Sequence, residues 1–103
     1  MSTYIVNASF ETDLEHEAYL AQKCRHDLEE SHGAAGLISF DIWKRAHAHT
    51  VEYVLVSKWE SKEDFKAWIS REDHVQGHKD QRQNKEEVRP KLTKRLTYFE
   101  GVL

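Results

Sequence analysis

The residues of this chain that could do chemistry lie mostly between positions 61 and 78. Trp68 is followed within ten residues by two histidines, His74 and His78. A neutral imidazole can bind a transition metal or haem iron through one ring nitrogen, and an indole offers a large flat wall. These residue types predict a pocket, and the seven histidines of the chain raise the question of a metal or a haem.

Two Ser-x-x-Asp sequences, at 61–64 and 70–73, decide how these side chains are positioned. Each can close a capping box, in which the hydroxyl and the carboxylate satisfy free backbone N–H groups at a helix start. We therefore expect two short helices that meet at a corner near Ser70. In one straight helix Trp68 and His78 would lie about 15 Å apart on faces about 80° out of line, whereas a corner lets both face one cavity.

The rest of the chain predicts the elements that hold this corner. Apolar residues alternate or run together in four strand-like segments, and they recur at helical spacing over 13–32. The strand-like segments are 4–10, 37–44, 51–59 and 92–103. With the bent helical segment after Trp59, the order is β-α-β-β-α-β. This order is typical of the α+β ferredoxin-like fold, an antiparallel sheet with both helices on one face. We expect 80–91 to be a long polar loop.

Bulk properties indicate one domain over residues 1–103. The net charge is −3 with both signs mixed along the chain, which argues against binding of nucleic acid. No apolar run is long enough to span a membrane, and the N-terminus lacks a signal-peptide pattern, so we expect a cytoplasmic protein. Cys24 is the only cysteine and falls on the apolar side of a predicted helix, which predicts a buried thiol.

The central strands are apolar on consecutive residues, as at 5–6 and 53–56, so both faces of the sheet are expected to be covered. Two helices cover only one face. A second copy presenting the same surface is the simplest cover for the other face. The sequence therefore predicts a homodimer built sheet against sheet.

With this frame, the chain resembles the antibiotic-biosynthesis-monooxygenase (ABM) superfamily of dimeric α/β barrels. The resemblance rests on the fold order, on Trp59 at a strand end and on the Phe65-x-x-Trp68 pattern. Within the superfamily the chain is most similar to the haem-degrading monooxygenases of the iron-regulated surface-determinant type. Those enzymes carry an Asn in the first strand, a Trp on the second helix and a His just beyond it. This sequence has Asn7, Trp68 and His78 in those places.

The resemblance implies a role for each of these three residues. His78 would be the proximal axial ligand of the haem iron. Asn7 would donate a hydrogen bond to dioxygen on the opposite side of the porphyrin. Trp68 would press on the porphyrin and distort it. Trp59 and Phe65 are assigned to packing.

Structural alternatives stand beside these roles. His78 could be an exposed histidine at a helix end, Asn7 a residue at a sheet edge or bulge, and Trp68 an ordinary core side chain. His74 lies one helical turn before His78 and could be the ligand instead, or the two could share a transition metal. The nearest acidic third ligands would be Asp73 and Asp80.

The implied function is oxidative opening of haem, which is substrate and cofactor at once, with O2 and electrons from a separate reductase. Iron is released when the ring opens. Three cations at Lys79, Arg82 and Lys85 could meet the haem propionates or simply be solvated. Two rival functions remain open: a cofactor-independent monooxygenase that oxidises polycyclic phenols or quinols, and a dimeric protein that binds haem without degrading it.

Overall fold

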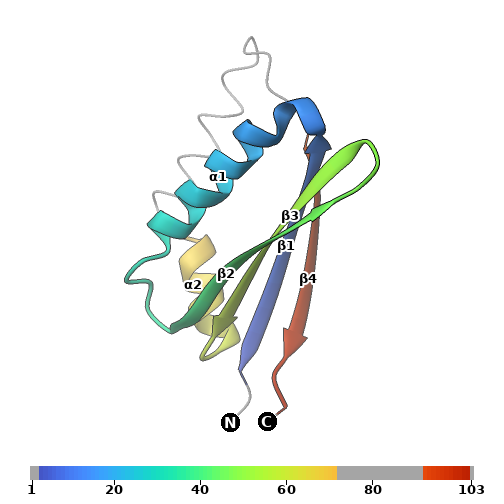
Figure 1. The fold of residues 1–103 in the computed structure, drawn as a ribbon. Coiled ribbons are helices and arrows are strands. Elements are labelled where there is room, and N and C mark those ends of the chain that lie inside the picture. Colours follow the sequence, from blue (N-terminus) through green and yellow to red (C-terminus); the bar gives the residue numbers. More distant parts are fainter. Residues whose placement is uncertain (1–2, 72–91, 103) are drawn as a thin grey trace.

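The computed structural model describes residues 3–71 and 92–102. Four strands form one antiparallel sheet in the order β2-β3-β1-β4, and two α-helices lie on the same face of that sheet (Figure 1). The elements are β1 (Tyr4–Asp13), a 3₁₀ turn η1 (Leu14–His16), α1 (Glu17–Glu30), β2 (Leu37–Ala46), β3 (Thr50–Trp59), α2 (Lys62–Ile69) and β4 (Thr93–Glu100). This confirms the predicted ferredoxin-like α+β fold.

The pairing of the strands decides which side chains face the helices. In β1 and β3, Tyr4 is directly opposite Trp59 and Phe10 is directly opposite Tyr53. Residues directly opposite each other in an antiparallel pair share a face, and successive residues alternate between faces. Phe10 packs in the core with side chains of α1 and β3, namely Leu20, Cys24 and Leu55. Alternate β1 residues from Tyr4 to Phe10 therefore face the helices, and the residues between them face away.

Cys24 has the buried position that its sequence context predicts. Its side chain is fully buried in the core beneath α1. Burial raises the pKa of the thiol to about 11, because the charged form would lose its hydration. The thiol is therefore protonated at neutral pH and serves packing.

The N-cap half of the first predicted capping box is confirmed at the start of α2, whereas the carboxylate of Asp64 accepts from the Ser61 hydroxyl at 2.9 Å and not from a backbone N–H. Ser61 is the N-cap residue, and its hydroxyl oxygen accepts a hydrogen bond from the backbone N–H of Asp64 at 3.2 Å. The helix ends at Ile69, beside the predicted corner at Ser70. The acidic half of the second box (72–73), His74, His78 and the predicted loop 80–91 lie outside the described residues.

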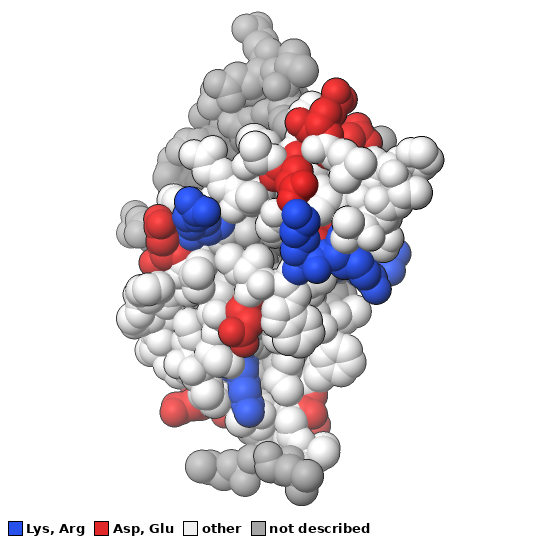
Figure 2. Space-filling model, in the orientation of Figure 1, with Lys and Arg blue, Asp and Glu red and all other residues white. Residues whose placement is uncertain are grey.

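Within the described ranges, no helix has the length and apolar character needed to cross a bilayer. On the face of the molecule in Figure 2, basic and acidic side chains are interspersed among uncharged ones.

Gly36 connects the end of α1 to β2 at a close contact with α2. Its φ of +81° lies in the left-handed region, which suits glycine. A Cβ atom at this position would collide with the side chain of Asp64. Gly33, on the same connection, has a φ of +82°, but a Cβ there would meet nothing within 4 Å.

This contrast predicts different costs for two alanine substitutions. Gly33→Ala should lower the free energy of unfolding by about 1–2 kcal/mol, the cost of a left-handed residue with a Cβ. Gly36→Ala should lose a further ~1–3 kcal/mol because Asp64 must also move. Urea denaturation followed by tryptophan fluorescence measures both. Equal losses for the two variants would show that the Asp64 contact costs nothing.

Candidate functional site

An aromatic cluster fills the space between α2 and the helix-facing side of the sheet. Phe65 lies with its ring centroid 5.8 Å from that of Trp59, 5.8 Å from that of Tyr4 and 6.1 Å from that of Tyr98. Tyr4 and Tyr98 stack at 6.0 Å. These distances are in the range where aromatic pairs attract each other beyond their simple burial. The packing roles predicted for Trp59 and Phe65 agree with these contacts.

Trp68 extends this cluster towards α1. Its ring centroid is 6.3 Å from that of Trp59, and the guanidinium of Arg71 lies 3.4 Å from the centre of the Trp68 ring. Arg71 also donates to the backbone oxygen of Trp68 at 2.8 Å and to the carboxylate of Glu30 at 3.1 Å. Glu30 is the last residue of α1, so this ion pair ties the ends of the two helices together. Trp68 thus forms a wall between the helices, with a cation on one face.

Asn7 lies on the other side of the sheet. It is directly opposite Val56 of β3 and Thr97 of β4, within a pairing of β1 that shows no shift in register. Strand β1 is an inner strand, so neither a sheet edge nor a bulge explains Asn7. Its side-chain oxygen is buried and has no hydrogen-bond partner. The structure does not bring Asn7 and Trp68 to the same face, and it leaves His78 outside the described residues.

Ser57 is a polar residue on the helix-facing side that the sequence reading missed. It is directly opposite Val6 and is 7% exposed. Its hydroxyl oxygen accepts a hydrogen bond from the indole N–H of Trp59 at 2.9 Å. The sequence signal for this contact is that Ser57 and Trp59 are two positions apart, which places both side chains on the same face of a strand.

Two lysines also converge on the helix-facing side, at the opposite end from Trp68. The ammonium groups of Lys23 on α1 and Lys94 on β4 lie 4.4 Å and 5.6 Å from the centre of the Phe10 ring. Partial burial lowers the pKa of Lys94, and the charge of Lys23 lowers it further. Lys23 pairs with Asp27 at 3.0 Å, while Lys94 has no carboxylate partner within residues 3–71 and 92–102. A ligand carboxylate would relieve the repulsion between these two cations.

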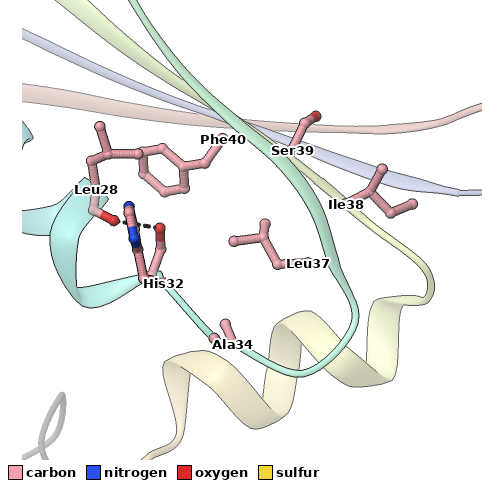
Figure 3. A pocket seen from close by; sticks show the side chains of 9 residues that line it. Leu28, His32, Ala34, Leu37, Ile38, Ser39 and Phe40 are labelled. Carbon is pink, nitrogen blue, oxygen red and sulfur yellow. Dashed lines mark hydrogen bonds between the residues drawn. The ribbon is translucent and has the colours of Figure 1, made fainter.

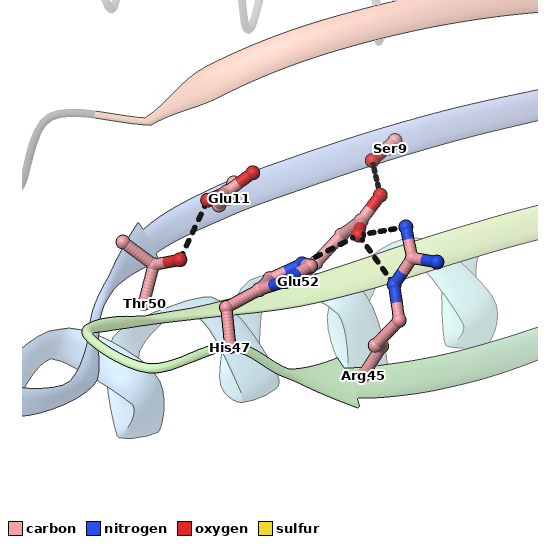
Figure 4. A network of polar contacts seen from close by, with 6 residues as sticks. All are labelled: Ser9, Glu11, Arg45, His47, Thr50 and Glu52. Atoms are coloured by element: carbon pink, nitrogen blue, oxygen red, sulfur yellow. Dashed lines mark hydrogen bonds and ion pairs between the residues drawn. The ribbon is translucent and has the colours of Figure 1, made fainter.

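A separate polar network lies on the face of the sheet away from the helices, near the turn between β2 and β3 (Figure 4). The carboxylate of Glu52 accepts from the Ser9 hydroxyl at 2.5 Å, from the Arg45 guanidinium at 2.7 Å and 3.1 Å, and from His47 at 3.1 Å. Hydrogen bonds from these three side chains lower the pKa of Glu52 to about 2, and the bond from Ser9 has the largest effect. Ligand atoms of Glu11, His47 and Glu52 lie within 4.8 Å of one another, as in a metal site. The carboxylate of Glu52 is already saturated by its three partners, so the network is complete as an ion cluster.

A cavity of about 370 Å³ lies between the end of α1 and β2 (Figure 3). Its lining comes from α1, the following loop and β2: Leu28, Ser31, His32, Gly33, Ala34, Leu37, Ile38, Ser39 and Phe40. Neither Asn7 nor Trp68 lines this cavity, so it is separate from the predicted site.

Comparison with protein families decides the relationship of the chain. Residues 3–80 match the model of the family described as antibiotic biosynthesis monooxygenase (ABM). The chain belongs to the ABM family. No significant match is found among curated protein sequences.

Solved structures share the ABM fold at low sequence identity. A putative antibiotic biosynthesis monooxygenase from Deinococcus radiodurans has a TM-score of 0.74 at 13% identity, over 97% of this chain and 93% of that chain. The haem-degrader MhuD from Mycobacterium tuberculosis, with two haems in its active site, has a TM-score of 0.63 at 23% identity, over 97% and 96% of the two chains. A putative ABM protein from Bacillus cereus has a TM-score of 0.64 at 17% identity, over 96% and 94%. At these identities the likeness shows the fold alone.

The Glu52 network of this ABM protein predicts a stability that depends on pH. Glu52→Gln should lower the free energy of unfolding at pH 7 by about 1–3 kcal/mol, because charge-assisted hydrogen bonds from Ser9, Arg45 and His47 are lost. The folded pKa of Glu52 is about 2, below the usual value of about 4.3 for an unfolded chain. Its ionised form therefore stabilises the fold fully above about pH 4.3, and this stabilisation is lost as the pH falls towards about 2.

Denaturant titrations between pH 2 and pH 7 measure this effect. The difference in free energy of unfolding between the wild-type protein and Glu52→Gln should become smaller as the pH falls from 7 to 2. Glu29→Gln, an exposed change on α1, should stay within ~0.5 kcal/mol of the wild type throughout. A gap for Glu52→Gln that does not change with pH would contradict the assignment.

Proposed function

We propose that this ABM protein binds haem on the helix-facing side of its sheet and opens the porphyrin ring with O2 and electrons from an external reductase. The observation that carries the proposal is the surface between Trp68 and the Lys23–Lys94 pair. One end is aromatic and the other end is cationic. The side chains between them on this face are mostly apolar: Val6, Ala8, Leu55, Leu96 and Tyr98, with the hydroxyl of Ser57 among them. Such a surface suits a flat apolar ligand with carboxylates along one edge.

Strand β4 supplies the open part of this surface. The helices leave β4 largely uncovered (Figure 1). Leu96 and Tyr98, which are directly opposite Ala8 and Val6 on the helix-facing side, are 42% and 48% exposed. Half-exposed apolar side chains beside an aromatic wall favour binding of an apolar ring system.

Each end of the ligand has a proposed partner. His78 would bind the iron as its axial ligand, with its other ring nitrogen held by a hydrogen-bond acceptor. Trp68 would confine the porphyrin at the end of α2. Lys23 and Lys94 would hold the carboxylates by charge-assisted hydrogen bonds. When bound, haem supplies the redox chemistry with O2, while the protein supplies ligation, orientation and confinement.

A second function is favoured by the position of Asn7. The resemblance assigns Asn7 as the donor that assists oxygen chemistry, yet in the structure Asn7 faces away from Trp68. Without that donor, binding of haem without its degradation becomes the alternative. A cofactor-independent monooxygenase remains the third outcome of the test below.

We also propose that the protein is a homodimer built through the face of the sheet away from the helices. Trp43 and Phe99 are 59% and 52% exposed there, and they flank Ile5, Val54 and Val56, which the strand register places on the same face. Exposed aromatic side chains around a partly buried apolar centre are typical of a protein interface. A second copy of the chain presenting the same face would cover the exposed aromatic side chains and the apolar centre of both copies.

Titration with haemin followed by ascorbate under air tests the function. Haem should produce a Soret band, and ascorbate should then make the band decay with release of iron to a chelator. His78→Ala should weaken haem binding at least about tenfold, or 1.4 kcal/mol, because the axial bond is lost. His74→Ala should bind as the wild type does. Lys94→Met should bind more weakly, because one carboxylate partner is lost.

The other outcomes discriminate between the functions. A Soret band that persists with ascorbate supports haem binding without degradation. Absence of a band points to a cofactor-independent monooxygenase, to be assayed with polycyclic phenols and quinols. Loss of binding in His74→Ala but not in His78→Ala would move the ligand by one helical turn.

The dimer is tested by the substitution Val56→Glu, which puts a charge at the centre of the open face. Sedimentation equilibrium should give twice the 12.1 kDa chain mass for the wild type and a shift towards the monomer for the variant. Lys62→Glu, an exposed change on α2, should leave the dimer unchanged. An equally stable dimer in Val56→Glu would exclude this face as the interface.

A further inference from the structure

The cavity of about 370 Å³ at the end of α1 lies apart from the surface proposed for haem, and the two share no residue. Its walls come from the last turn of α1, from 31–34 and from the first residues of β2 (Figure 3). All nine lining residues belong to the described part of the chain. The volume is within the range of small-molecule sites, about 300–1,000 Å³. This cavity is therefore a candidate binding site whether or not the protein binds haem.

Apolar side chains form one wall of the cavity. Leu28, Leu37 and Phe40 line it and are partly buried. Phe40 also packs against the core cluster that contains Phe10, which holds this wall in place. At Gly33 a Cβ atom would meet nothing within 4 Å, so this edge of the cavity is open. Such a lining suits a compact apolar body, such as one aromatic ring, that leaves water on binding.

The end of α1 makes the surroundings of the cavity electrostatically negative. The aligned backbone dipoles of a helix place partial negative charge at its C-terminus, and the last turn of α1 contains no basic residue to offset it. That turn does contain Glu29 and Glu30. Glu30 pairs with Arg71, whereas Glu29 is exposed and has no ion pair within the described ranges. None of the residues that line the cavity is Lys or Arg. Positive charge on a ligand is therefore favoured here, and negative charge is opposed.

Hydrogen-bond acceptors are available at the same end of the cavity. The backbone oxygens of His32 and Gly33, two exposed lining residues just after α1, accept no hydrogen bond from any residue in 3–71 or 92–102. The Ser31 hydroxyl already donates to the backbone oxygen of Leu28 at 2.6 Å, so it offers no donor to an anion. A protonated amine has three N–H donors and no acceptor, which matches these free oxygens.

We infer that this cavity binds a small organic cation, namely a protonated amine carried on one apolar ring. The ring lies against Leu37 and Phe40, and the ammonium group lies at the C-terminal end of α1, near the backbone oxygens of His32 and Gly33. This binding site goes beyond the proposed haem function and does not depend on it.

Amide NMR shifts during titration test the inference with three probes that share a phenyl ring. At pH 7, 2-phenylethylammonium is positive, 2-phenylethanol is neutral and phenylacetate is negative. The ammonium probe should bind about two- to fivefold more tightly than the alcohol, because of the helix end, and phenylacetate should bind most weakly. The shifts should be concentrated at 28–40. Equal affinities for the three probes would overturn the assignment of a cation. Absence of shifts at 28–40 with every probe would overturn the site itself.

Two alanine positions give a matched pair of variants. Ala34→Leu puts a larger side chain into the cavity and should weaken binding of the ammonium probe about tenfold. Ala35→Leu makes the same change at the next residue, which is exposed and does not line the cavity, and should bind as the wild type does. Unchanged binding in a folded Ala34→Leu variant would contradict the assignment of the cavity.

Two charge variants test the electrostatic basis, and they serve alone if Ala34→Leu does not fold. Glu29→Gln should reduce the advantage of the ammonium probe over the alcohol and leave the affinity for the alcohol unchanged. His32→Lys adds a positive charge at an exposed lining residue and should make phenylacetate bind more tightly than the ammonium probe. An order of affinities that stays the same in His32→Lys would overturn the inference.

Discussion

Strand β1 lies between β3 and β4, and helices cover one of its faces, so its side chains alternate between two different environments. Val6 and Phe10 are buried against the helices, at 3% and 5% exposure. A shift of the pairing by one residue would move both to the opposite face and bring Asn7 towards the helices. The loss of two buried apolar side chains from the core opposes that shift. The position of Asn7 thus follows from the burial of its neighbours.

Trp59 organises the helix-facing side. It is directly opposite Tyr4, packs against two aromatic side chains of α2, and donates its indole N–H to Ser57. A buried indole needs an acceptor for its N–H, and a serine two residues earlier on the same strand face provides one. This one interaction therefore satisfies the polar atom of a buried core residue and links two side chains on the same face of β3.

The other face of the sheet is divided along its length. Near the turn between β2 and β3, Glu52 is enclosed by Ser9, Arg45 and His47, and its charge is fully satisfied. Towards the chain termini the surface becomes apolar around Val56 and Phe99. Protein interfaces commonly have an apolar centre with a polar rim, and this face has an apolar region beside a charged one. Asn7 lies between the two regions.

The sequence by itself determined the order of the strands and helices, the start of α2 at Ser61, the buried thiol of Cys24 and the ABM relationship. These features depend on local periodicity and capping, which neighbouring residues specify. Only the tertiary structure decided that Asn7 and Trp68 lie on opposite faces, because a match of residue types does not record which face of a strand each residue occupies. Only the tertiary structure also shows that Lys23 and Lys94 lie beside the same Phe10 ring. Those residues are distant in the chain, and the burial of Phe10 between α1 and the sheet sets their separation.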